Sequence, residues 1–431
     1  MIEAFWGVAA MLGLSFLRLP IAFSLALVGF FGFAHLTSTS AALSMIASVT
    51  HESGMSYTLS VIPLFVLMGS FVTRAGLSRE LYAASHAFLG HRRGGLAMAT
   101  IVACGGFSAI CGSSLATAAT MSKVAIPSMR EYGYADTLAA GSVAAGGTLG
   151  ILLPPSVILI IYGFLTETSI GALFAAGVIP GLLAVMLYIA AIAVMIRIDP
   201  TLGPQSEASD ARARLRALLR VWQVLVLFVL VMGGIYGGVF TPTEAAGVGA
   251  FGAFIFVILR AKPDMALLRA VLRDAAETTA MLFSVVIGAM IFSNFISISG
   301  VTGALSDTVQ ALQWSPAMVL AVIIAFYIVL GAVLETMSMV LLTVPVIYPI
   351  VAGLGYDLVW FGIIVVVVTE VSLITPPIGM NVFVLRSILP DIRMATIFRG
   401  VFPFVLADIV RLALLTLFPT LSLFLPHLFA L

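Results

Sequence analysis

Residues 148–163 read "TLGILLPPSVILIIYG", a membrane-span-like run with two adjacent prolines near its middle. Proline lacks a backbone N–H and clashes with the preceding helical turn, so the pair is expected to break the helix. The run "EVSLITPPIGMNVFVL" (370–385) repeats this combination 222 residues later. Because unsatisfied backbone groups are costly in lipid, such breaks belong where they line a cavity.

Composition places the chain in a membrane. Of its 431 residues, 61% are hydrophobic and only 9% are charged, and the mean hydropathy is +1.19. Soluble domains carry about 25% charged residues. The apolar runs are long enough for spanning helices and lack the short alternating pattern of barrel strands. We therefore expect an all-α polytopic membrane protein, and the net charge of +1 favours no nucleic-acid partner.

The apolar runs define the expected organisation. The first run is interpreted as a retained helix, not a signal peptide, and a polar linker at 199–220 divides the chain. Two apolar regions, 95–127 and 316–349, are interrupted midway. Crossing spans are expected at roughly 3–18, 20–36, 57–73, 136–163, 172–196, 221–239, 243–260, 279–298, 357–385 and 400–425, with 37–56 as a loop.

The two halves align with one another. At an offset of 222 the proline pairs coincide, and beyond them the offset becomes 223. Such a register predicts an internal repeat. Residues that meet in this alignment include Pro20 with Pro242, Pro127 with Pro349, Gly133 with Gly355, Gly177 with Gly400 and Pro180 with Pro403.

The distribution of Lys and Arg sets the expected orientation. If both interrupted regions enter and return on one side, every positive residue except Arg411 lies on the cytoplasmic side or at its edge. The two regions are then re-entrant hairpins, the halves are inverted repeats, and both termini are periplasmic. Inverted repeats with broken helices are typical of secondary transporters, whose sites lie between the repeats. The breaks offer carbonyls to a cation and helix N-termini to an anion.

The hairpins supply the candidate site residues. Gly112, Ser113 and Ser114 form the expected tip of the first hairpin, where small residues serve either an ion site or tight helix packing. Ser113 and Ser114 align with Glu335 and Thr336. An intramembrane acid is a functional hypothesis by default, and a structural carboxyl is the alternative. Glu370 is a second such acid, for which site and structural roles stay equally open.

Two further segments and the two cysteines have no assigned role in the expected site. Segments 79–93 and 303–314 are expected to be amphipathic arms, with ordinary loops as the alternative. Cys104 and Cys111 are interpreted as small buried thiols. Phosphate-binding and hydrolase signatures are absent from the sequence, so we expect no enzyme.

At several motifs the sequence resembles the large membrane subunit of the tripartite ATP-independent periplasmic (TRAP) transporters, over essentially the whole chain. The residues that carry the resemblance are "FSAICGSSLATAA", "IPSMREYGY", "LGILLPPSVILIIYG", "AAGVIPG", "GAVLETMSMVLLTVPVIYP" and "LITPPIGMNVFVL". The resemblance implies an elevator mechanism, with scaffold and arm at 1–93 and 221–313, a transport domain at 94–197 and 314–431, and a cytoplasmic linker at 198–220.

The resemblance also implies function. A bacterial inner-membrane symporter would import an organic acid anion with Na⁺ and no other cofactor. Its partners would be a small four-helix membrane subunit, expected not to be fused here, and a periplasmic substrate-binding protein, with lipid around it. The implied substrate contacts are Ser108, Ser113, Ser114, Pro155, Ser156, Pro377 and Asn381, and the implied Na⁺ ligands are Ser113, Ser114, Gly147, Gly150, Pro154, Gly331, Glu335, Thr336, Thr375 and Gly379.

Three positions depart from the family pattern. Family members usually have Asp at Glu335, Gly at Ser372 and Asn at Val368, which puts the second cation site's ligand set in doubt. The alternative function is a self-sufficient ion-coupled carboxylate transporter of the same architecture. A channel or non-transporting scaffold is the candidate from another class, and the sequence does not name the substrate.

Overall fold

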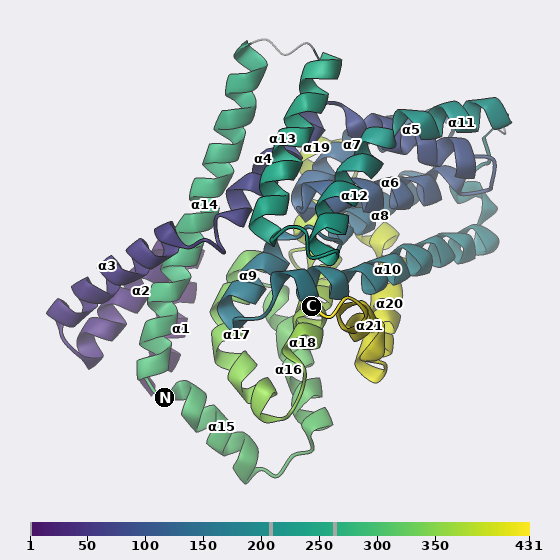
Figure 1. Cartoon of the computed structure of the whole chain (residues 1–431). Coiled ribbons are helices and arrows are strands. Elements are labelled where there is room, and N and C mark those ends of the chain that lie inside the picture. Colours follow the sequence, from purple (N-terminus) through teal and green to yellow (C-terminus); the bar gives the residue numbers. More distant parts are fainter. Residues whose placement is uncertain (1, 207–209, 262–264) are drawn as a thin grey trace.

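The structure is a computed structural model that describes residues 2–206, 210–261 and 265–431. Within these ranges every regular element is a helix (Figure 1), which confirms the expected all-α class. The first half contains α1 (Ile2–Phe16), α2 (Ile21–Leu36), α3 (Thr39–Met55), α4 (Val61–Arg74), α5 (Leu77–Leu89), α6 (Gly95–Cys111), α7 (Ser114–Glu131), α8 (Asp136–Thr148), the 3₁₀ turn η1 (Leu149–Ile151), α9 (Val157–Thr166) and α10 (Ile170–Ile198).

A linker and the second half follow. The linker holds the 3₁₀ turn η2 (Pro200–Leu202) and α11 (Ala211–Arg220). The second half contains α12 (Trp222–Tyr236), α13 (Pro242–Ala261), α14 (Met265–Ile298), α15 (Val301–Ala311), α16 (Pro316–Gly331), α17 (Thr336–Gly353), α18 (Leu358–Ile374), α19 (Met380–Ile388), α20 (Met394–Leu417) and α21 (Thr420–Leu428).

The element bounds repeat with the sequence offset. Adding 222 to the bounds of α7 gives the bounds of α17, and α8 and α18 begin 222 residues apart. Each half has the same succession of arm, hairpin, broken helix and long helix. The arms expected near 79–93 and 303–314 are the helices α5 and α15. Both proline pairs stand in the chain breaks that follow α8 and α18, and both Pro–Pro bonds are cis.

The expected loop at 37–56 is wrong, because α3 occupies most of it. Its counterpart is the first part of α14, so the expected span at 279–298 also begins too late. The N-cap Ser38 accepts a hydrogen bond from the backbone N–H of Ala41, which fixes the start of α3. Many small and polar residues lower the mean hydropathy of α3, so an apolar-run criterion passes over it.

The polar linker contains a helix, and one further expectation needs correction. The linker contains α11, which the Asp210 side chain caps by accepting from the Ala213 N–H at 2.6 Å. The span expected at 400–425 is two helices, α20 and α21. By length and composition, five helices of the described ranges can cross a membrane alone, or seven if two bent pairs each count as one. Hairpins and breaks divide the other spans into shorter helices.

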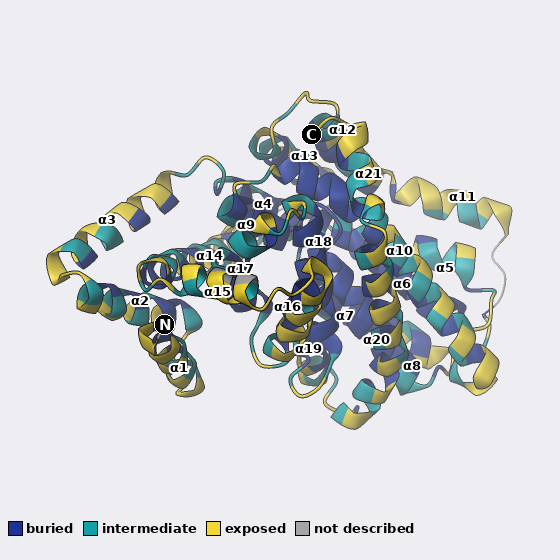
Figure 2. Ribbon diagram, turned by 90° about the horizontal axis from the view of Figure 1, so that it is seen from below, coloured by how far each residue is buried: buried dark blue, intermediate teal, exposed yellow. Residues whose placement is uncertain are grey.

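Close helix packing positions the breaks. A Cβ added to Gly141 of α8 would lie 2.4 Å from the carbonyl oxygen of Gly400 in α20, so glycine is needed at this crossing. The first hairpin packs on α8, α10 and α19, while α2–α4 pack with α13 and α14. Figure 2 shows the buried surface concentrated in the centre, along α18 and α7, and exposed residues along α3 and α11.

Candidate functional site

The two hairpin tips have equivalent caps. Ser113 precedes α7, and its Oγ accepts from the backbone N–H of Ala116 at 3.4 Å. Glu335 precedes α17, and its Oε2 accepts from the N–H and the hydroxyl of Ser338 at 3.3 and 3.1 Å. A carboxylate at a helix N-terminus is favoured by the helix dipole. Aligned residues of the two halves therefore cap equivalent helices.

The first break lies against the first tip. Gly112 has a φ of +63°, and a Cβ there would lie 2.6 Å from the carbonyl oxygen of Pro155. A Cβ on Gly150 would lie 2.6 Å from the carbonyl of Ser113. Both glycines thus permit direct backbone contact between the tip and the break.

A hydrogen-bond chain joins the first hairpin to the second half. Ser114 Oγ donates to Asn381 Oδ1 at 2.9 Å, and Asn381 Nδ2 donates to the carbonyl of Ala144 at 3.0 Å. Because the Ser114 hydroxyl donates its proton here, its lone pairs remain available to a cation.

Both tips meet at one cavity of about 640 Å³, which we call the tip cavity. Its wall brings together four sequence candidates, Ser113, Ser114, Glu335 and Thr336. Other parts of the wall come from α4 and α14. This volume is in the range of pockets that hold small organic ligands.

The other candidates lie outside the tip-cavity wall. Ser108 is fully buried, and its hydroxyl has no hydrogen-bond partner among the described residues. The Ser156 hydroxyl donates to the Ile151 carbonyl at 2.5 Å within the first break. Gly147, Gly150, Pro154, Pro155 and Asn381 are buried behind the tip, whereas Pro377 is exposed and Thr375 half-buried at the second break.

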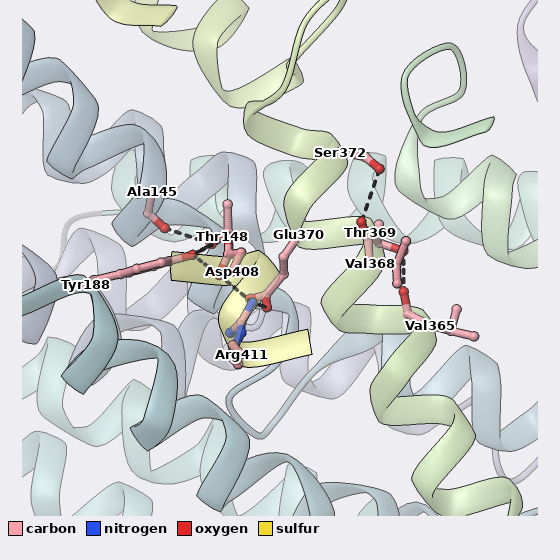
Figure 3. Close-up of polar contacts among 10 residues, drawn as sticks. All are labelled: Ala145, Thr148, Tyr188, Val365, Val368, Thr369, Glu370, Ser372, Asp408 and Arg411. Carbon is pink, nitrogen blue, oxygen red and sulfur yellow. Dashed lines mark hydrogen bonds and ion pairs between the residues drawn. The ribbon is translucent and has the colours of Figure 1, made fainter. Parts of the chain in front are cut away.

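A small void of about 10 Å³ lies beside the second tip. Its lining includes the candidates Gly331, Thr336 and Gly379, together with Thr369 and Ser372. Both of these added hydroxyls donate to the carbonyl four residues earlier, as Figure 3 shows, which leaves oxygen lone pairs for a cation. A void of roughly 10–15 Å³ is the least that holds one water molecule, so the space suits a single small ligand.

Positive charge marks one end of the tip cavity. Arg74 pairs with Asp274 at 2.8 Å, and Lys123 of α7 also lies in the wall. A second cavity of about 660 Å³, the counterpart cavity, is lined by α9, α14 and α17. The repeat places Ile296 and Pro345 there at the positions of Arg74 and Lys123. The two cavities therefore differ in charge at equivalent positions.

Glu370 lies in a buried cluster away from the tip cavity. Its Oε2 pairs with Arg411 Nη2 at 2.5 Å, and Arg411 also pairs with Asp408 at 2.8 Å. All three side chains have no exposed surface. Figure 3 shows them pointing toward one another, with Tyr188 approaching from α10. This geometry favours the structural alternative for Glu370.

Sequence reasoning missed Asp408 and Tyr188. A signal existed, since Arg411 is the one Lys or Arg residue expected within a span, and Asp408 stands three residues before it. On a helix this spacing puts both side chains on one face. A buried arginine requires an acidic partner.

Comparison with known proteins decides the family. Residues 8–421 match the model of the tripartite ATP-independent periplasmic transporter, DctM component. The chain belongs to this family. Its TRAP relatives include the C4-dicarboxylate TRAP transporter large permease protein DctM of Pseudomonas aeruginosa, which is 37% identical over 377 residues, covering 87% of this chain and 88% of that protein.

Two more comparisons bear on this TRAP permease. The sialic acid TRAP transporter large permease protein SiaM of Vibrio cholerae is 33% identical, over 97% of both chains. A crystal structure of the Alcanivorax borkumensis YdaH transporter superposes with a TM-score of 0.61 at 15% identity, covering 88% of this chain and 89% of that one. The likeness to YdaH shows a shared fold. The likeness to SiaM supports a transporter role.

Proposed function

We propose that this chain is the permease of a Na⁺-coupled TRAP importer of an organic acid anion. The observation that carries the proposal is the tip cavity, where both hairpin tips converge. Its wall contains serine and threonine hydroxyls, a carboxylate and two helix N-termini. Oxygen ligands suit a hard cation, and helix N-termini suit an anion.

The charge of the wall favours an anionic substrate. Lys123 and Arg74 balance Asp274 and Glu335, so one bound cation gives the cavity a net positive charge. A carboxylate substrate then restores neutrality, which provides a physical reason for coupled binding. The named relatives that transport C4-dicarboxylates and sialic acid support an organic acid as substrate.

The remaining proposal concerns the system. The family description names a tripartite periplasmic transporter. We therefore assign as partners a small membrane subunit and a periplasmic binding protein, in a bacterial inner membrane. The transport elements would move as an elevator between the side of the tip cavity and that of the counterpart cavity. The asymmetry of positive residues supports a cytoplasmic position for Lys123 and for the mouth of the tip cavity.

Cation binding can be tested on the purified chain. A ligand that binds only the folded state stabilises that state by RT ln(1 + [L]/Kd), so the unfolding temperature rises as the ligand concentration exceeds Kd. We expect NaCl to raise this temperature more than KCl or choline chloride at equal ionic strength, and Ser114→Ala to reduce the difference. Identical unfolding temperatures in all three salts would contradict Na⁺ binding by the chain alone.

A further inference from the structure

The buried cluster repeats one contact in both halves of the chain. Thr148 and Glu370 stand at equivalent positions by the 222 offset, and Tyr188 and Arg411 by the 223 offset that holds beyond the proline pairs. The Thr148 Oγ1 lies 3.2 Å from the Tyr188 hydroxyl, and Glu370 Oε2 lies 2.5 Å from Arg411 Nη2. In each half, a broken helix thus contacts the long helix that follows it.

Asp408 joins the two equivalent contacts. It accepts from the Tyr188 hydroxyl at 2.8 Å and pairs with Arg411 at 2.8 Å. The equivalent position in the first half is Val185, which offers no polar group. A single carboxylate therefore connects both repeats, and Figure 3 shows it between the two long side chains.

The cluster stands directly behind both breaks. Thr148 is the last residue of α8, two residues before the glycine that contacts the first hairpin tip. Glu370 follows Thr369, which lines the small void beside the second tip. A shift of either broken helix must therefore change the cluster, since its members are fully buried and closely packed.

We propose that Asp408, with Tyr188 and Arg411, is a positioning device that makes the two breaks move as one unit. Hydrogen bonds to charged groups in a low-dielectric interior hold a defined geometry. Ligand-induced ordering at one break is then transmitted to the other, and cation binding becomes cooperative. This cooperativity rests on the proposed Na⁺ coupling, whereas the mechanical link does not.

The cooperative effect is tested by Tyr188→Phe in the chain assembled with its two partners. The ring and its contact with Phe404 at 5.4 Å are kept, and only the hydroxyl is lost. The matched control is Tyr327→Phe, another fully buried tyrosine, whose hydroxyl accepts from Thr343 outside the cluster.

Uptake against Na⁺ concentration is the readout. We expect Tyr188→Phe to lower the Hill coefficient toward one at retained maximal uptake, while Tyr327→Phe keeps the wild-type coefficient. An unchanged coefficient in Tyr188→Phe, or a coefficient of one in the wild type, would overturn cooperative coupling. A purely structural tyrosine would lower thermal stability without altering the coefficient.

A second measurement separates the mechanical link from Na⁺ coupling. Thr148→Val and Glu370→Gln are made singly and together, and the unfolding temperature of each variant is measured in a K⁺ buffer. Independent sites give additive shifts, whereas members of one network do not. Non-additive shifts support the mechanical link, whether or not uptake depends on Na⁺. Uptake that is independent of Na⁺ would refute the proposed function and leave the link in place. Additive shifts overturn the link.

Discussion

Ser113 and Glu335, 222 residues apart, are the N-caps of equivalent helices, and both lie in the wall of the tip cavity. The repeat therefore places a neutral hydroxyl at one tip and a carboxylate at the other. This difference gives the cavity its asymmetry, since only the second tip offers a negative charge to a cation.

Replacing Glu335 tests that charge. We expect Glu335→Gln to keep the fold and to shift the Na⁺ requirement of transport upward, because the amide keeps one carbonyl oxygen but loses the charge. Na⁺-dependent uptake, normalised to folded protein, is the measurement. Complete loss of a cap costs about 0.5–2 kcal/mol and the amide oxygen can still accept, so stability, measured in parallel, should fall by less than this.

The control for this variant is another cap in the same hairpin. Ser315 accepts from the Met318 N–H at 3.3 Å at the start of α16. Ser315→Ala should lower stability and leave the Na⁺ curve in place. A Glu335→Gln variant with the wild-type Na⁺ curve and maximal uptake would rule out the carboxylate as a cation ligand.

Lys123 tests the positive mouth of the tip cavity. It stands nine positions after Ser114, the first residue of α7, so it lies ~14 Å along the helix from the tip. We expect Lys123→Glu to slow exchange of anionic substrate severalfold and Lys123→Arg to keep it. Salt should narrow the difference, because exposed charges are screened. A salt-independent defect shared by both variants would contradict an electrostatic role.

The charge asymmetry predicts the membrane orientation of the chain. In a background in which Cys104 is Ala and Cys111 is Ser, single cysteines are placed at Ala211 and Gly353, both exposed. A membrane-impermeant maleimide added to intact cells with a permeable outer membrane should label position 353 and spare position 211. Labelling of position 211 but not of position 353 would contradict the predicted orientation.

Stability should respond unequally to changes in the buried cluster. Glu370→Gln leaves Arg411 balanced by Asp408, whereas Arg411→Leu leaves two carboxyl groups buried without their cation. Breaking a buried pair in the latter way costs roughly 3–5 kcal/mol. Thermal unfolding and purified yield should fall more for Arg411→Leu. A larger fall in unfolding temperature for Glu370→Gln than for Arg411→Leu would contradict the conclusion that Arg411 neutralises both carboxyl groups.

The sequence was most informative about helix breaks, because adjacent prolines interrupt the interior of a helix. Adjacent prolines predicted both broken helices, because proline acts locally. The interrupted apolar regions and the distribution of Lys and Arg predicted both hairpins, and the 222 offset related the two halves. Helix α3 was missed, since a helix rich in small and polar residues has no strong apolar run. Helix α14 was shortened for the same reason.

The candidate site was predictable only in part. Sequence could identify the tip residues, because the ends of a hairpin are local features of sequence. Tertiary packing then brings together Ser113, Ser114, Glu335 and Thr336. The contact of Ser114 with Asn381 joins residues 267 apart, and no local pattern reveals it. The partners of Arg411 likewise depend on how α10, α18 and α20 pack, which only the folded chain determines.

Uptake in proteoliposomes tests the central claim most directly. The chain is reconstituted with its small membrane subunit, the binding protein is added outside, and radiolabelled succinate or sialic acid is supplied with an inward Na⁺ or K⁺ gradient. We predict uptake of one organic acid that requires both partners and the Na⁺ gradient, and that collapses when the gradient is dissipated. Equal uptake by the chain alone, or equal uptake in K⁺, would contradict a tripartite Na⁺-coupled importer.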